Sequence, residues 1–379
     1  MFLDYETLRV IWWLLLAVLL TGFALFDGFD LGVGMLLPVV AKDDIEKRTL
    51  LNTIGAVWEG NQVWFILGGG AIFAAWPQLY AVSFSGFYLA MLVVLLALIL
   101  RPVGFKYRSK LTCPKWRNAW DLALFIGGFV PALIFGVAVG NVLQGVPFHF
   151  TDDLIPHYTG SFLGLLNPFA LLSGLLSVAM LATHGAGYLS VKLEAQLQAR
   201  AQNVMQISSA VTFFLYLLAG VLLYFMIDGY AIQGQLNHAG PSNPLFKKVI
   251  QSSGAWFHNY QDYKYLLLLP VMGFVGSLIA FITAKKCPMT SFMGSSISII
   301  GIIGSVGASM FPIILPSSSN PAQSLTVWDS SSSQLTLFIM LIMAVIFMPI
   351  VLAYTAWVYK VLSGKVTTDF VEKNKHELY

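Results

Sequence analysis

The chain has 379 residues, of which 57% are apolar, 14% aromatic and only 10% charged. Soluble domains carry about 25% charged residues, so this composition excludes a water-soluble globule and a disordered chain. The net charge of +3, without a basic run longer than two residues, excludes a nucleic-acid-binding module. Two cysteines exclude a disulfide framework. A polytopic membrane protein remains.

Nine segments are long and apolar enough to cross a bilayer, whose hydrocarbon layer is about 30 Å thick and needs about 20 helical residues. We predict an all-α fold, because these runs lack the short alternating pattern of barrel strands. The first segment is predicted to remain as an anchor, since Asp4 and Glu6 stand where a signal peptide has basic residues. In chain order, the predicted spans are Ile11–Val40, Leu51–Trp76, Leu79–Leu100, Trp120–Val142, Ser161–Thr183, Val204–Ile227, Tyr265–Ala284, Met289–Leu315 and Leu335–Val358.

The lysines and arginines of the connections fall very unevenly on the two sides of a nine-span chain. Seventeen lie on one side and four on the other. Because cytoplasmic connections carry the excess, we predict an external N-terminus and a cytoplasmic C-terminus. Cys113 and Cys287 then lie in cytoplasmic connections, where thiols stay reduced. The connections are too short for a separate folded domain, so residues 1–379 are predicted to form a single transmembrane domain.

Side chains with the spacing of a haem, zinc or iron–sulfur site are not found in the sequence. Five of the six histidines fall in external connections or the tail, and His184 falls at the cytoplasmic end of the fifth predicted span. The 13 methionines are more typical of packing in apolar helices than of metal ligation. We therefore predict no metal site and no cofactor held by ligands of this chain.

Carboxylates in the cytoplasmic half of the first two spans are the unusual feature. Asp27 and Asp30 share one helix face, and Glu59 lies about 12 Å into the second span. Ionisable groups in a membrane are costly and often mark proton or ion paths. Since carboxylates three residues apart repel each other, we predict that Arg101, which closes the third span, pairs with Asp30, with Asp27 beside it. Glu59, without an evident partner, is predicted to pass protons on.

Trp58 and Trp64 flank a polar run, residues 59–62 (EGNQ), inside the second predicted span. Amides exposed to lipid would lack hydrogen-bond partners, so this run indicates a buried interface, either within this chain or with a partner. A simpler interpretation stays open, in which the carboxylates are interfacial groups that only anchor helix ends.

Seven motifs along the chain carry a resemblance to a known family. They are residues 4–8 (DYETL), 27–34 (DGFDLGVG), 58–64 (WEGNQVW), 68–77 (GGGAIFAAWP), 101–110 (RPVGFKYRSK), 140–148 (GNVLQGVPF) and 328–337 (WDSSSSQLTL). On these residues the chain resembles subunit II of cytochrome bd-type quinol oxidases, which are bacterial respiratory terminal oxidases. The resemblance runs nearly from end to end.

The resemblance implies two four-helix bundles plus one helix in the bacterial inner (cytoplasmic) membrane. The implied complex is an electrogenic quinol oxidase that reduces O₂ to water, and its haem-bearing subunit I holds two haems b and one haem d. Subunit II would stabilise subunit I and line a cytoplasmic proton path. A quinone bound in this subunit, small single-helix accessory subunits and lipid are further implied partners, and nucleic acid is not.

The resemblance also implies roles for individual residues. By motif position, Asp30 and Arg101 correspond to the family's buried ion pair and Glu59 to its proton-path carboxylate, while Trp64 lies near its proposed O₂ access. Asp27, Lys110 and Trp58 also fall on motif positions, and we assign Asp27 and Lys110 to the proton path and Trp58 to O₂ access or a partner interface.

Two departures bear on the proton route. Val57 stands where some members have a histidine, and Lys106 stands where some have an acidic residue. Two alternatives remain beside the oxidase subunit. One is a stand-alone proton-coupled secondary transporter, although such proteins place coupling sites near the midplane between repeats. The other is a purely structural scaffold, which differs only in whether Glu59 moves protons.

Overall fold

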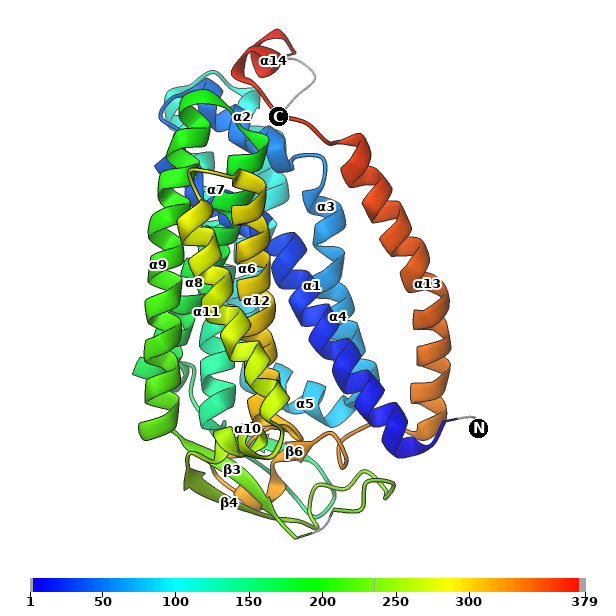
Figure 1. Cartoon of the computed structure of the whole chain (residues 1–379). Helices are drawn as coiled ribbons and strands as arrows, with labels where there is room; N and C mark the ends of the chain where they lie inside the picture. Colours follow the sequence, from blue (N-terminus) through cyan, green and yellow to red (C-terminus); the bar gives the residue numbers. More distant parts are fainter. Residues whose placement is uncertain (1–2, 235, 375–379) are drawn as a thin grey trace.

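Figure 1 shows the computed structural model as an elongated set of helices that run between two ends of the molecule. The structure describes residues 3–234 and 236–374, so Lys375 and His376 lie outside the described residues. One end carries α2 (Asp44–Ile54) and α14 (Thr368–Lys373), and we call it the α2 end. The opposite end carries the β-strands, and we call it the hairpin end.

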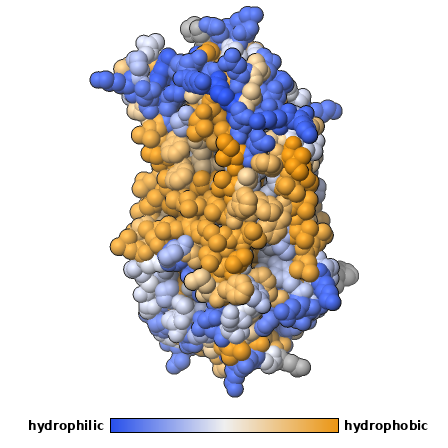
Figure 2. Space-filling model, turned by 60° about the vertical axis from the view of Figure 1, so that its left-hand side comes forward, coloured by the Kyte–Doolittle hydropathy of each residue, from blue (hydrophilic) through white to orange (hydrophobic). Residues whose placement is uncertain are grey.

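Eight helices in the described part of the chain are long and apolar enough to cross a membrane. Figure 2 shows the result as a broad apolar belt between two polar ends, as expected for a multi-pass membrane protein. These helices are α1 (Tyr5–Val40), α6 (Tyr88–Tyr107, extended by η1, Arg108–Lys110), α7 (Pro114–Gln144), α8 (Pro168–Lys192), α9 (Ala195–Phe225), α11 (Leu268–Thr283, preceded by η4, Lys264–Leu267), α12 (Pro288–Met310) and α13 (Gln334–Val361).

The second predicted span, Leu51–Trp76, is not one helix. Its residues are divided among α2, the one-turn α3 (Trp58–Asn61) and α4 (Val63–Ala75). Asp43 caps α2 by accepting a hydrogen bond from the Glu46 backbone N–H, so α2 begins before the apolar run does. Hydropathy does not detect the break after Ile54, because the turn there consists of the small or apolar residues Gly55, Ala56 and Val57. The break after Asn61 is a single residue, Gln62, too short to interrupt the apolar run.

The third predicted span, Leu79–Leu100, begins too early. A separate helix, α5 (Pro77–Gly86), ends at Gly86, and α6 begins only after Phe87. Pro77 starts α5, as its fixed φ and missing N–H favour. In the sequence the two helices look like one apolar run, because α5 carries apolar residues as well. Two of them, Leu79 and Val82, are buried.

Three two-stranded antiparallel sheets cover the hairpin end. Their residues lie in stretches predicted from the sequence to be connections or the ends of spans. Short helices connect them. The strand pairs are β1 (Phe148–Phe150) with β2 (Pro156–Tyr158), β3 (Asp228–Gln233) with β4 (Lys248–Ser253), and β5 (Ile313–Leu315) with β6 (Leu325–Thr326). The short helices are η2 (Leu163–Leu165), η3 (Ala255–Phe257), α10 (His258–Asp262) and η5 (Pro321–Gln323).

Arg9, near the start of α1, ties two loops of the hairpin end together. Its buried guanidinium donates to Ser331 Oγ at 2.7 Å and to the carbonyl oxygens of His238 and Gly240 at 2.6 and 3.0 Å. The same group lies 3.5 Å from the centre of the Tyr5 ring. A guanidinium group carries five N–H donors, so one arginine side chain can bind several acceptors at once.

Glycines let α1 pack closely against α8. A Cβ on Gly185 would lie 2.6 Å from the carbonyl carbon and 2.7 Å from the Cα of Gly32, so two backbones meet where no side chain fits. Small residues serve this purpose in membrane helices, because close van der Waals packing drives their association. This contact fixes the position of α1, which carries Asp27 and Asp30, against the rest of the bundle.

We expect Gly185→Ala to destabilise the protein, because the new methyl group meets backbone atoms that cannot move aside. Overpacking of this kind costs about 1–3 kcal/mol, which a thermal unfolding scan of the purified protein will show as a lower midpoint. The matched control is Gly220→Ala on α9, where a Cβ would meet nothing within 4 Å. An unchanged midpoint for Gly185→Ala would contradict the packing described here.

Candidate functional site

A buried ion pair joins α1 to α6. Arg101 Nη2 lies 2.9 Å from Asp27 Oδ1 and Nη1 lies 3.2 Å from Asp27 Oδ2, and both side chains are almost fully buried. The predicted Asp30–Arg101 pair is therefore wrong in its carboxylate. Both Nη atoms of Arg101 face the two oxygens of Asp27, while the Asp30 carboxylate is held by Asn61 instead.

Asp30 has a different partner. Its Oδ2 accepts a hydrogen bond of 2.7 Å from Asn61 Nδ2, and Asn61 Oδ1 accepts one of 2.7 Å from the Tyr359 hydroxyl. Asp30 Oδ1 is buried without a hydrogen-bond partner. The chain Tyr359–Asn61–Asp30 thus connects α13, α3 and α1. Asn61 belongs to the polar run of residues 59–62 noted in the sequence. Tyr359 lies 298 residues from Asn61 along the chain, and no sequence pattern predicts that the two meet.

Trp58 and Trp64 both pack inside this chain. Trp58 stacks on Phe105 with ring centroids 5.1 Å apart, and the Arg101 guanidinium lies 5.8 Å from its ring. Trp64 stacks on Phe26 of α1 with centroids 5.2 Å apart. The expectation that these two residues serve O₂ access or a partner interface stays a prediction.

The structure exposes Glu59 on the surface of this chain, beside the exposed Gly60 and Val63. A continuous second span, as predicted from the sequence, would place Glu59 about 12 Å inside the membrane. That span is broken, so the one-turn α3 turns Trp58 and Asn61 inward and Glu59 outward. Lys110, at the end of η1, is also exposed.

A charged network holds the α2 end together near Lys110. Asp121 of α7 accepts from Arg108 Nε at 2.5 Å and from Lys47 Nζ at 2.9 Å. Arg108 also reaches Asp44 at 2.9 Å, and Arg117 reaches the other oxygen of Asp44 at 2.6 Å. Because each carboxylate here serves two cations, the network ties α2, η1 and α7 into one unit.

His184 lies inside the helix bundle rather than at a span end, because α8 continues to Lys192. Its Nδ1 lies 2.9 Å from Ser295 Oγ and its Nε2 lies 2.9 Å from the Leu25 carbonyl oxygen. Its ring stacks on Phe292. With both nitrogens occupied, His184 joins α8 to α1 and α12. Within residues 3–234 and 236–374, no group of three or more His, Cys, Asp or Glu side chains is placed to hold a metal ion.

Comparison with known proteins identifies the family. The sequence profile described as "Cytochrome bd terminal oxidase subunit II" matches residues 8–362. The chain belongs to this family. It is 53% identical over 379 residues to the "Probable cytochrome oxidase subunit 2" of Haemophilus influenzae, and both chains are covered completely. It is 48% identical over 378 residues to the "Cytochrome bd-I ubiquinol oxidase subunit 2" of Escherichia coli K12, again with complete coverage.

A more distant relative and a solved structure extend the comparison. The "Cytochrome bd ubiquinol oxidase subunit 2" of Bacillus subtilis is 30% identical over 362 residues, which is 95% of this chain and 97% of that protein. A chain of the bd oxidase from Geobacillus thermodenitrificans superposes with a TM-score of 0.71 over 94% of this chain and 98% of that one. At 15% identity, this similarity shows a shared fold. The protein is therefore a multi-pass subunit of a quinol oxidase whose haems lie in its partner, subunit I.

We expect Asp27→Asn to destabilise the purified complex more than Asp30→Asn. Asp27→Asn leaves the buried Arg101 without its counter-charge, which costs about 3–5 kcal/mol for a buried pair, whereas Asp30 forms no ion pair with any residue that the structure describes. Thermal unfolding of the two matched variants, followed by haem absorbance, measures the difference. If Asp30→Asn proved the more damaging change, the assignment of Asp27 as the partner of Arg101 would be wrong.

Proposed function

We propose that this chain stabilises subunit I and delivers protons to it from the cytoplasm while the complex oxidises quinol and reduces O₂ electrogenically. The observation that carries the proposal is that the one-turn α3 holds both the exposed Glu59 and Asn61, which donates a hydrogen bond to the buried Asp30. Buried carboxylates are expensive, and they are retained where protons or ions move.

The proposed orientation places the α2 end in the cytoplasm of a bacterial inner membrane. Support comes from the lysine and arginine excess in the connections at that end. In addition, α1 begins at the hairpin end while α13 finishes at the α2 end, so the chain must cross an odd number of times (Figure 1). Eight long helices alone would return it to its starting side, and α3 with α4 supplies the ninth crossing.

We further propose that the single transmembrane domain, residues 1–379, consists of two four-helix bundles and one separate helix. The first bundle contains α1, α4, α6 and α7, and the second contains α8, α9, α11 and α12. Within the groups, α7 packs on α1 and α6, and α11 packs on α9 and α12, while α8 joins the two groups through its contacts with α1 and α7. The separate helix is α13, whose buried residues are limited to Leu337. Its exposed apolar surface is available to subunit I, to accessory single-helix subunits and to lipid.

Along the proposed route, Glu59 takes protons at the surface of this chain and passes them toward the buried groups or directly to subunit I. Asn61 holds Asp30 at 2.7 Å, and Asp30 retains one unpartnered oxygen that is able to accept a proton. Asp27 keeps Arg101 charged and in place beside Asp30. Lys110 lies exposed at the cytoplasmic mouth, where Lys106 replaces the acidic group of other members and Val57 offers no histidine relay.

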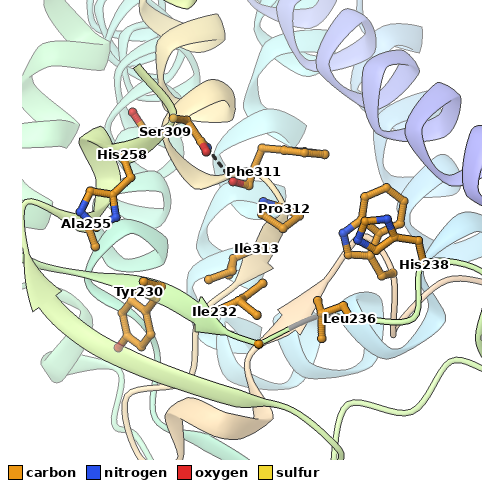
Figure 3. Close-up of a pocket in the computed structure, with 14 residues that line it drawn as sticks. Tyr230, Ile232, Leu236, His238, Ala255, His258, Ser309, Phe311, Pro312 and Ile313 are labelled. Carbon is orange, nitrogen blue, oxygen red and sulfur yellow. Dashed lines mark hydrogen bonds between the residues drawn. The ribbon is translucent and has the colours of Figure 1, made fainter. Parts of the chain in front are cut away.

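A cavity of about 560 Å³ at the hairpin end is the candidate location for the quinone that the family resemblance implies. Figure 3 shows that it lies between β3, the end of α12 and the segment that leads into β5. Sites for small organic molecules have this size and combine aromatic walls with a few polar groups. Here the aromatic lining includes Tyr230, Phe311 and Trp328, and the polar lining includes His238, His258 and Asn259.

Replacing Glu59 with Gln tests the proton role. We expect the purified complex to keep its haem absorbance but to reduce O₂ at least about 10-fold more slowly, since a positioned proton donor contributes this much or more. Glu59→Asp, which keeps the carboxylate, is the matched control and should retain most turnover. Unchanged turnover in Glu59→Gln would leave only the scaffold function, and a colourless chain with transport activity would favour the transporter.

A further inference from the structure

Two histidines face each other across the β1–β2 hairpin. The strand register places His149 opposite His157, and their rings lie 5.6 Å apart between centroids at an angle of 20°. The residue pairs on either side show whether this is a hydrogen-bonded or a non-hydrogen-bonded pair of the ladder. Backbone hydrogen bonds join Thr151 to Ile155 and Thr159 to Pro147, so the histidines occupy a hydrogen-bonded pair between them. Side chains in such a pair project from the same face of the strands.

The backbone that carries these histidines is held in place. Phe148 and Phe150 point to the opposite face and are buried, as the alternation of a strand requires. The Gln323 side chain accepts from the Phe150 N–H at 2.7 Å and donates to its carbonyl at 3.2 Å. Ser319 Oγ donates to the Phe148 carbonyl at 2.6 Å. The two imidazoles therefore stand on a fixed platform, with His157 exposed and His149 partly exposed.

We propose that His149 and His157 form a binding site for a divalent transition metal such as Zn²⁺, Ni²⁺ or Cu²⁺. Imidazole nitrogen is a preferred ligand of these ions. Two Zn–N bonds of about 2.0–2.1 Å at a tetrahedral angle need nitrogens about 3.3 Å apart, a separation that rotation of two facing imidazoles provides. The hairpin supplies two protein ligands and water completes the coordination, since the described residues contain no larger ligand group.

This site is separate from the proposed proton route. It lies at the hairpin end, whereas Glu59 lies on α3 and Asp30 lies on α1. Asp152 and Asp153 occupy the exposed turn between β1 and β2. A test of this metal site is therefore independent of any test of the function proposed for Glu59.

The test uses the purified, chelator-washed oxidase complex and Zn²⁺ as the probe. In equilibrium dialysis with elemental analysis, we expect the wild type to bind one Zn²⁺ that His157→Asn binds about tenfold or more weakly, equivalent to about 1.4 kcal/mol. The matched control is Asp262→Asn on α10, which removes another exposed side chain able to bind metal at the same end, outside the cavity proposed for quinone and without altering the pair. O₂ reduction without added metal should be equal in all three proteins.

Cu²⁺ serves as a second probe, because its electron paramagnetic resonance spectrum reports bound nitrogen. We expect hyperfine coupling to imidazole nitrogen in the wild type and its weakening in His157→Asn. The proposal is overturned if Zn²⁺ binds equally to wild type and His157→Asn, or if the Cu²⁺ spectrum does not depend on His157. In either case the stacked rings serve only to pack the hairpin.

Discussion

The two-point contact between Arg101 and Asp27 is the interaction on which the proposed chemistry depends. It places a fixed positive charge inside the helices, next to a second carboxylate, Asp30, that has no cation of its own. Without Arg101, two carboxylates one helical turn apart would repel each other in a medium that screens charge poorly. With it, the charge of Asp27 is balanced, and in the proposed proton route Asp30 is the buried group that accepts the proton.

The surrounding structure serves to hold this arrangement in place. Close glycine contact fixes α1 against α8, and Trp58 lies beside Arg101 and stacks on Phe105. Asn61 joins Asp30 to Tyr359, so the otherwise exposed α13 is attached to the buried carboxylate. In this subunit of a haem-bearing oxidase, Glu59 is a carboxylate at the surface of the chain. It is only two residues from Asn61, which binds the buried carboxylate of Asp30.

Much of the fold follows from composition and hydropathy, and the limits of that inference have physical causes. Eight of the predicted spans correspond to long apolar helices, because a stretch of about 20 apolar residues has few alternatives in lipid. The breaks after Ile54 and at Phe87 escape prediction because small or apolar residues make them up, so the hydropathy stays high across them. Among the site residues, charge and depth single out Asp27, Asp30 and Arg101, but which carboxylate the guanidinium chooses depends on packing. Tyr359 is brought to Asn61 by tertiary structure alone.

The most direct test of the account is the time course of proton uptake during a single turnover of the reduced complex in lipid vesicles. A pH indicator placed on one side of the membrane identifies the side that loses protons. We expect uptake only from the side of the α2 end, slowed in Glu59→Gln in step with O₂ reduction. Uptake from the hairpin end, or uptake at the wild-type rate in Glu59→Gln, would contradict it.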